Sequence, residues 1–204
     1  MSSEQTVFIV DDDPAVRDAL SWMIGSLQYP VETFDSAQAF LDVYDAEKAG
    51  CLVLDVRLPG MSGLQLQQKL NAENIDLPVI IITGHGDVPM AVRAMQAGAV
   101  NFFEKPFRDQ EVLDCIQDAL QQDARQRQNK ESNKEVLENI NTLTPREKEI
   151  MKLMVRGDSN KMIAASCGIS VKTVEVHRAR IIDKMQARSL PALVRAVLSV
   201  EGKY

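Results

Sequence analysis

Polar side chains that could do chemistry stand at the ends of apolar segments in the first half of the chain. They supply carboxylate, hydroxyl and ammonium groups, and they are Asp11, Asp12, Asp13, Asp55, Thr83 and Lys105. Clustered carboxylates repel one another unless a hard divalent cation is bound, and Mg²⁺ prefers oxygen ligands. A carboxylate beside such a cation can attack a phosphoryl group and form an aspartyl phosphate. The hydroxyl of Thr83 and the ammonium of Lys105 would then stabilise the phosphoryl oxygens.

These side chains converge only if the apolar segments before them form a parallel sheet. The segments of strand length are 6–10, 31–34, 51–54, 77–82 and 100–103. Stretches with helical periodicity lie between them, at 14–27, 36–46, 63–72 and 87–97, and another begins near Asp109. The runs CLVL and LPVIII are apolar throughout, as strands buried on both faces should be. This alternation predicts a doubly wound α/β domain, which binds ligands at the carboxyl ends of its strands.

A simpler interpretation of the acidic residues is that they cap the helices that follow the strands. This interpretation stays open for Asp13, because a helix is predicted to begin at Pro14. It does not account for the joint occurrence of the other carboxylates with Thr83 and Lys105. We therefore favour a phosphoryl-binding site at this edge of the sheet.

The composition is that of an ordinary globular protein with two differently charged halves. Of 204 residues, 45% are hydrophobic and 25% charged, which excludes wholesale disorder, collagen-like fibres and a disulfide scaffold. No apolar run approaches a membrane span, and the 3 cysteines are far apart, so we expect a cytoplasmic protein with reduced thiols. Residues 1–120 hold 7 Lys/Arg and 19 Asp/Glu, whereas residues 121–204 hold 16 and 10. Only the basic second half is suited to a polyanion.

The second half shows helical patterns and no strand or internal repeat. Helices are predicted at 145–156, 159–167, 170–185 and 189–200. Thr144 and Glu147 have the spacing of a capping box at the start of the first of these helices. Residues 121–142 contain few β-branched or aromatic side chains. The sequence leaves open whether they extend the preceding helix or form a solvated linker.

The third of these helices has one apolar stripe, made of Val174, His177, Ile181 and Met185. Packing in the core is the favoured interpretation of His177, because its neighbours on the stripe are apolar. The order helix, helix, tight turn, helix is typical of a helix-turn-helix, whose last helix enters the DNA major groove. Base recognition is therefore expected from the exposed face of this helix, and phosphate contacts from its basic edges.

Four motifs together resemble the receiver domain of two-component response regulators. They are V-D-D, L-D-V-R-L-P-G-M-S-G, I-I-I-T-G and F-F-E-K-P-F, and they fall within residues 5–120. The resemblance implies a flavodoxin-like fold with a five-stranded parallel sheet in the order 2-1-3-4-5. It also implies that Asp55 accepts a phosphoryl group from a phosphohistidine of a sensor histidine kinase.

The receiver resemblance implies a set of metal ligands as well. Mg²⁺ would be bound by Asp12, Asp55 and the backbone carbonyl of Arg57, with Asp11 acting through water. Arg57 and His85 occupy positions that tune the lifetime of the phosphate in this family. A solvated loop histidine is an equally good interpretation of His85.

The same resemblance implies a switch. Thr83 and Phe102 match the switch hydroxyl and the switch aromatic residue, and Lys105 matches the phosphate-binding lysine. Many relatives have Tyr where this chain has Phe102, so the switch here must work by packing alone. The Lys105–Pro106 bond is expected to be cis.

Phosphorylation is expected to promote association of two receivers through the predicted helix at 87–97 and the strand after it. Small or flexible apolar residues there could form a two-fold patch, and they are Val88, Met90, Ala91, Ala94 and Met95. Core packing is an alternative for some of them, because a helix must bury one face.

The motifs L-T-P-R-E-K-E-I and V-K-T-V-E-V-H-R-A-R occur in the second half of the chain. Because of these motifs, residues 143–200 resemble a LuxR-type DNA-binding domain. The resemblance implies base contacts from Glu175, Val176 and Ala179, and dimerisation through the last helix. The implied phosphate contacts are Asn160, Lys161, Lys172, Thr173 and Arg180. The two resemblances together identify the chain as a member of the FixJ/NarL group of response regulators. Its parts would be a receiver at 1–120, a linker at 121–142 and a DNA-binding domain at 143–204.

We therefore expect a transcription factor, most simply an activator, and not a turnover enzyme. The chemistry of the chain itself would end with the self-catalysed transfer of a phosphoryl group to Asp55. No catalytic residue is assigned. The expected partners are a sensor histidine kinase, promoter DNA, RNA polymerase and a second copy of the chain, with no membrane. A phosphatase of the haloacid dehalogenase type also uses an Asp-x-Asp motif, but here Pro14 and Ala15 follow it and no cap is present. The text L-T-P-R-E-K-E-I also resembles the start of a sigma-factor-like promoter-binding module. That alternative would leave the acidic first half of the chain unexplained.

Overall fold

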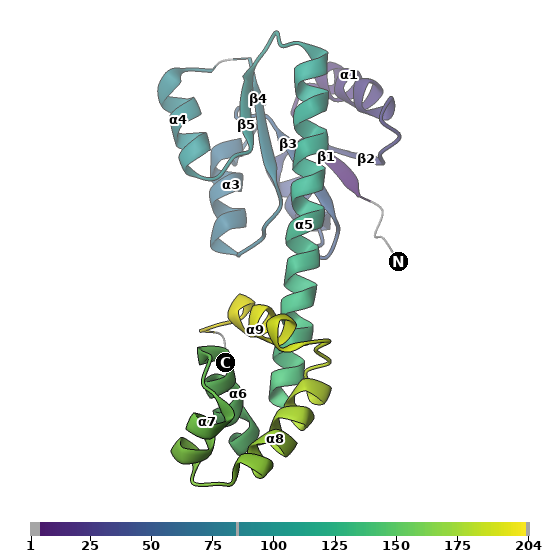
Figure 1. Ribbon diagram of the computed structural model, residues 1–204. Helices are drawn as coiled ribbons and strands as arrows, with labels where there is room; N and C mark the ends of the chain where they lie inside the picture. Colours follow the sequence, from purple (N-terminus) through teal and green to yellow (C-terminus); the bar gives the residue numbers. More distant parts are fainter. Residues whose placement is uncertain (1–4, 85, 203–204) are drawn as a thin grey trace. The chain divides into compact units, whose positions relative to one another are not determined.

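The computed structural model of the chain describes residues 5–84 and 86–202 (Figure 1). It divides into two compact units, Met1–Gln126 and Arg127–Tyr204. Helix α5 (Asp109–Asn141) contributes residues to both. Each unit has a hydrophobic core of its own.

The first unit is built on a five-stranded parallel sheet. Its strands are β1 (Thr6–Val10), β2 (Val31–Phe34), β3 (Gly50–Leu54), β4 (Val79–Thr83) and β5 (Asn101–Glu104). They lie in the order β2-β1-β3-β4-β5, and all neighbours pair in parallel. The predicted receiver fold and its strand order are confirmed.

Helices cover both faces of this sheet. They are α1 (Pro14–Gly25), α2 (Ala37–Val43), α3 (Gly63–Ala72), α4 (Val88–Gln96) and α5. Alternate residues of a strand point to opposite faces. Val7 of β1 therefore shares a core cluster with residues of α1 and α5, whereas Phe8 shares one with residues of α2, α3 and α4. Coverage on both faces explains why β1, β3 and β4 are buried along their whole length.

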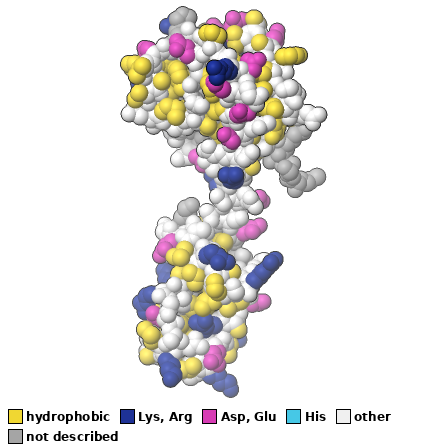
Figure 2. All heavy atoms as spheres, turned by 45° about the horizontal axis from the view of Figure 1, so that its top comes forward, with side chains coloured by type: hydrophobic (Ala, Val, Ile, Leu, Met, Phe, Trp, Pro, Cys, Tyr) yellow, Lys and Arg dark blue, Asp and Glu magenta, His cyan; other side chains and the backbone are white. Residues whose placement is uncertain are grey.

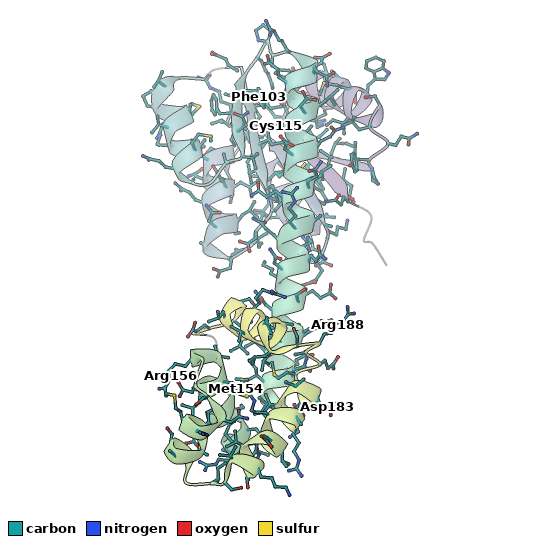
Figure 3. The ribbon with its side chains drawn as sticks, in the orientation of Figure 1. Phe103, Cys115, Met154, Arg156, Asp183 and Arg188 are labelled. Carbon is teal, nitrogen blue, oxygen red and sulfur yellow. The ribbon has the colours of Figure 1, made fainter. Side chains whose placement is uncertain are left out.

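The N-terminal part of α5 completes the first unit. Phe103 of β5 and Cys115 of α5 belong to the same core cluster (Figure 3). Farther along the helix, the buried carboxylate of Asp123 accepts a hydrogen bond of 2.9 Å from the N–H of Gly50. The first unit thus extends beyond residue 120. The cysteines Cys51, Cys115 and Cys167 are free.

The second unit is built of helices in the part of the chain that the structure describes. After the end of α5 come α6 (Pro145–Arg156), α7 (Asn160–Cys167), α8 (Val171–Lys184) and α9 (Leu190–Ser199). Thr144 caps α6 through the predicted capping box with Glu147. Gly157 ends α6 in the left-handed conformation, at φ 94°. Met154 of α6 is buried in the core of this unit (Figure 3).

Residues 121–141, for which the sequence left two alternatives open, are helical and belong to α5. Val136, Leu137 and Ile140 from its last turns pack into the core of the second unit. Among the described residues, no helix is long and apolar enough to cross a membrane.

Candidate functional site

The carboxylates of the site lie at the carboxyl ends of two adjacent central strands. The N–H of Asp55 donates to the carbonyl of Val10 at 2.8 Å, which continues the β1–β3 ladder to the strand ends. Asp11 follows Val10 directly, and both Asp11 and Asp55 are buried. The carboxyl ends of parallel strands meet at one edge, so residues 44 positions apart in the chain become neighbours.

Lys105 enters this site from the end of β5. Its backbone N–H donates to the carbonyl of Thr83 at 2.9 Å. Its ammonium lies 2.7 Å from Oδ2 of Asp11 and 3.5 Å from Oδ2 of Asp55. The side chains of these aspartates are only 3% and 10% exposed, so the attraction is screened weakly by solvent. The Lys105–Pro106 bond is cis, as expected.

The acidic residues offer a set of hard oxygen ligands. Carboxylate oxygens of Asp11, Asp12 and Asp55 all lie within 4.8 Å of one another, and Asp12 is exposed to solvent. Oxygen donors with an open side towards water are what Mg²⁺ requires, because it retains several waters. The residues present therefore fit the predicted cation. The ligand role of the Arg57 carbonyl stays a prediction.

Burial changes the acid–base properties of Asp11. Desolvation raises the pKa of its carboxyl above the ordinary value, and the hydrogen bond from Lys105 opposes this rise. The N–H of Asp13 also donates to Asp11 Oδ1 at 3.0 Å. A bound cation would oppose the effect of burial, because it favours the ionised carboxylate.

Asp13 does not join this cluster but caps helix α1. Its Oδ1 accepts a hydrogen bond of 2.9 Å from the N–H of Ala15, and Pro14 takes the first helical position. The capping interpretation that the sequence left open for Asp13 is confirmed.

Gly63, at the start of α3, lies against the backbone of Asp55 and was not singled out in the sequence. A Cβ atom on Gly63 would lie 2.1 Å from the backbone carbonyl oxygen of Asp55. Only glycine allows the helix to approach the backbone of Asp55 so closely. The signal was present as the last glycine of L-P-G-M-S-G, which is the first residue of the helix predicted at 63–72.

The two predicted switch residues lie on neighbouring strands and on the same face of the sheet. Phe102 pairs with Ile81, two residues before Thr83, and Thr83 pairs with Glu104. Thr83 is fully buried, whereas Phe102 is half-buried and packs against the core cluster beneath α4. His85 lies outside the described residues.

The predicted two-fold patch on α4 is partly wrong. Ala94 is completely buried and so is not available to a partner, and the half-buried Met90 packs against the core. The exposed apolar side chains are Val88, Val92 and Met95, at 77%, 47% and 46% exposure. Some of the apolar residues of α4 are therefore buried, because they lie on the side of the helix that faces the sheet.

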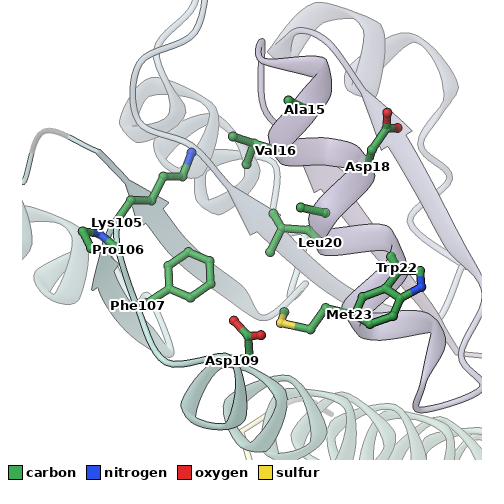
Figure 4. Close-up of a pocket in the computed structure, with 11 residues that line it drawn as sticks. Ala15, Val16, Asp18, Leu20, Trp22, Met23, Lys105, Pro106, Phe107 and Asp109 are labelled. Atoms are coloured by element: carbon green, nitrogen blue, oxygen red, sulfur yellow. The ribbon is translucent and has the colours of Figure 1, made fainter.

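An apolar groove of about 750 Å³ lies beside the site, between α1 and the segment after β5 (Figure 4). Lys105, which contacts the site carboxylates, also lines the groove. Its other lining residues are mostly apolar and include Leu20, Met23 and Phe107, with Trp22 84% exposed. Acidic residues Asp18 and Asp109 complete the lining.

In the second unit, α8 has the two faces that the sequence predicted. Val174, Ile181 and Met185 are buried, and His177 is half-buried with its Nδ1 atom enclosed by protein. The predicted base-reading residues Glu175, Val176 and Ala179 are exposed. The helix therefore presents these three side chains to solvent.

The predicted phosphate-contacting residues lie on α7 and α8 of the same unit. Lys161, Lys172, Thr173 and Arg180 are exposed, and Asn160 is half-buried. The hydroxyl of Thr173 is 2.8 Å from that of Ser170, the N-cap of α8. On the face shown in Figure 2, Lys and Arg side chains gather over the second unit, whereas Asp and Glu predominate over the first.

The parallel sheet with carboxylates converging on a lysine, followed by a unit with two-faced helix α8, defines a receiver joined to a DNA-binding domain. Residues 7–117 match the family model of the response regulator receiver domain, and residues 141–197 match that of bacterial regulatory proteins of the luxR family. The chain belongs to the response regulators, in the FixJ/NarL group.

Its relatives cover almost the whole chain. It is 41% identical over 198 residues to the transcriptional regulatory protein FixJ of Bradyrhizobium diazoefficiens, covering 97% of each. It is 46% identical over 189 residues to the response regulator protein TodT of Pseudomonas putida, covering 93% of this chain and 83% of TodT. The solved structure of the response regulator StyR matches at a TM-score of 0.84 and 46% identity, covering 98% of this chain and all of StyR. Full-length FixJ from B. japonicum matches at 0.60 and 40% identity, covering 97% and 98%.

Proposed function

We propose that this transcriptional regulator is switched by phosphorylation of Asp55. The observation that carries the proposal is the position of the Lys105 ammonium, 2.7 Å from Asp11 and 3.5 Å from Asp55, beside the cluster of carboxylate oxygens. A carboxylate oxygen of Asp55 attacks the phosphorus of a phosphohistidine, a P–O bond forms, and the P–N bond breaks with release of the histidine. Lys105 compensates negative charge on the transferred group.

The carboxylates of Asp12 and Asp55 and the backbone carbonyl of Arg57 would bind Mg²⁺, with Asp11 acting through water. When bound, the cation supplies positive charge to the phosphoryl oxygens and permits the anionic donor to approach the acidic site. Thr83 would donate its hydroxyl to the phosphate, and Phe102 would then take the space that Thr83 leaves. Arg57 and His85 would tune the lifetime of the phosphate.

The groove beside Lys105 is the surface we assign to the histidine kinase. The phosphodonor would approach Asp55 from this side of the site, since Lys105 both lines the groove and contacts the carboxylates. The apolar lining suits the apolar face of a helix, and Asp18 and Asp109 suit basic residues on that helix.

The output is binding of promoter DNA by the second unit. Glu175, Val176 and Ala179 would contact bases, and Asn160, Lys161, Lys172, Thr173 and Arg180 would contact phosphates. Phosphorylated receivers would associate through Val88, Val92 and Met95, and association would raise the effective concentration of the second DNA-binding unit by about 10²–10⁴. The dimer would then recruit RNA polymerase and activate transcription in the cytoplasm, where promoter DNA is found.

Phosphoryl labelling with acetyl phosphate and Mg²⁺ tests the proposal. Wild-type protein should take up one stable label, and Asp55→Asn should take up none. Asp13→Asn is the matched control, because Asn also caps helices and should leave labelling unchanged. Full labelling of Asp55→Asn would contradict the assignment of the acceptor. Continuous release of phosphate would instead indicate a phosphatase.

A further inference from the structure

Helix α4 is attached to its neighbour α3 at its C-terminal end. The side-chain amide of Gln67 donates to the carbonyl of Ala94 at 3.1 Å, and that of Asn71 donates to the carbonyl of Ala97 at 2.7 Å. Ala94 is completely buried. The two helices lie side by side on one face of the sheet (Figure 1). Two donors from α3 thus hold the last turn of α4.

The N-terminal end of α4 has a different environment. Its first residue, Val88, is 77% exposed. Its cap is supplied by the residue that precedes the helix, since Asp87 Oδ1 accepts the N–H of Met90 at 2.6 Å. The C-terminal carbonyl of Ala94, in contrast, accepts the N–H of Ala99 at 3.0 Å in addition to the Gln67 amide. The two ends of the helix are therefore held unequally.

Gln67 is not explained by stability alone. It is 1% exposed, and its Oε1 atom is buried without a hydrogen-bond partner in the part of the chain that the structure describes. A buried acceptor without a partner costs free energy, which offsets part of what the hydrogen bond from the same side chain contributes. What Gln67 specifies is the position of the carbonyl that it binds.

The segment before α4 is in contact with the switch aromatic residue. A Cβ atom on Gly86 would lie 3.0 Å from Cε1 of Phe102. There is accordingly almost no free space between this segment and the ring. A displacement of the Phe102 ring would act directly on Gly86 and on the start of α4.

We propose that α4 moves as a lever whose hinge is its C-terminal turn, held by the amides of Gln67 and Asn71. Movement of Phe102 displaces the N-terminal end through Gly86, while Ala94 stays in place. Val88 and Val92 then move relative to a fixed C-terminal turn. Gln67 and Asn71 are positioning residues. The proposal rests on the proposed function, because phosphorylation of Asp55 is the event that would move Phe102.

Hydrogen exchange of the full-length chain, with and without beryllofluoride and Mg²⁺, tests the hinge. In wild-type protein the mimic should change exchange in residues 86–92 and leave residues 94–99 within about twofold. Gln67→Met combined with Asn71→Ala should accelerate exchange at Gly98 and Ala99 about tenfold without the mimic. The mimic should then affect 94–99 as well. Gln68→Met is the control, since Gln68 is exposed on the same helix.

Two results would overturn the hinge. One is an equal response at both ends of wild-type α4, which would mean that the helix moves as a unit. The other is unchanged exchange at Gly98 and Ala99 in the double variant. Asn71→Ala alone, at an exposed position, repeats the test without altering the core. Labelling of Asp55 is measured separately: its absence would contradict the proposed function, while the comparison without the mimic would still decide whether the amides hold α4.

Discussion

The ammonium of Lys184 lies 2.7 Å from a carboxylate oxygen of Glu147 and joins the end of α8 to the start of α6. The same buried carboxylate accepts the N–H of Thr144 at 2.9 Å and its hydroxyl at 3.1 Å. A capping box that looks local in the sequence thus also connects two helices of the DNA-binding unit. The hydrogen bond from Lys184, followed by those from Thr144, lowers the pKa of Glu147 from 4.5 to about 2.

This lowered pKa predicts that acid weakens the second unit. A depressed pKa means that Glu147 stabilises the fold fully above pH 4.5 and loses this effect as the pH falls towards 2. Glu147→Gln should accelerate amide exchange in α6 and α8 at pH 7 and flatten the pH dependence of that exchange below pH 4.5. An identical pH dependence in wild type and variant would contradict the prediction.

Lys105→Met should uncouple cation binding from phosphoryl transfer. The substitution keeps the aliphatic stem and removes the charge beside Asp11 and Asp55. Labelling of Asp55 should slow by about 10²-fold, because a fixed charge aimed at the transferred group is lost. Mg²⁺ affinity, measured by calorimetry, should be equal or higher, since the ammonium competes for the same oxygens. Lys69→Met, on the surface of α3, is the control, and labelling of Lys105→Met at the control rate would refute the role.

Gly63→Ala should damage the receiver although it adds one methyl group. The new Cβ would lie 2.1 Å from the carbonyl oxygen of Asp55, so α3 must move away from β3. Overpacking of this kind costs about 1–3 kcal/mol or more. Gly25→Ala is the matched control, because a Cβ there meets nothing within 4 Å. Urea denaturation followed by far-UV circular dichroism should show the loss for Gly63→Ala alone, and equal midpoints would contradict it.

Substitutions on α7 and α8 should affect either the affinity for DNA or the preferred DNA sequence, depending on the residue changed. Lys161→Ala and Lys172→Ala should weaken binding to all sequences about equally, each reducing the slope of log K against log salt by about 1. Val176→Thr should change the preferred sequence at one position, because Val176 lies on the exposed face of α8. Selection from a random DNA library compares the variants. An unchanged preference for Val176→Thr would remove this residue from base recognition.

The sequence by itself determined the architecture of both units. Apolar runs, helical periodicity and caps such as Thr144–Glu147 are local signals, and they specify elements with little help from the rest of the chain. The spacing of the motifs then places Asp11, Asp55 and Lys105 at strand ends, and a parallel sheet brings strand ends together. The metal-binding and phosphoryl-binding assignments stay predictions, because they concern groups that bind from outside.

Tertiary structure alone decided the relationships between elements. Helicity of residues 121–141 was undecided, because polar residues of this kind suit both a helix and a linker. The C-terminal end of helix α5 is held by Ile140 and its neighbours, which pack in the same core as residues of α6 to α9. Met90 and Ala94 are as apolar as Val92 in the sequence, but only the side of α4 that meets the sheet is buried. The bonds from Lys184 to Glu147 and from Gln67 to Ala94 join residues far apart in the chain, and their formation depends on how helices pack, which no local pattern encodes.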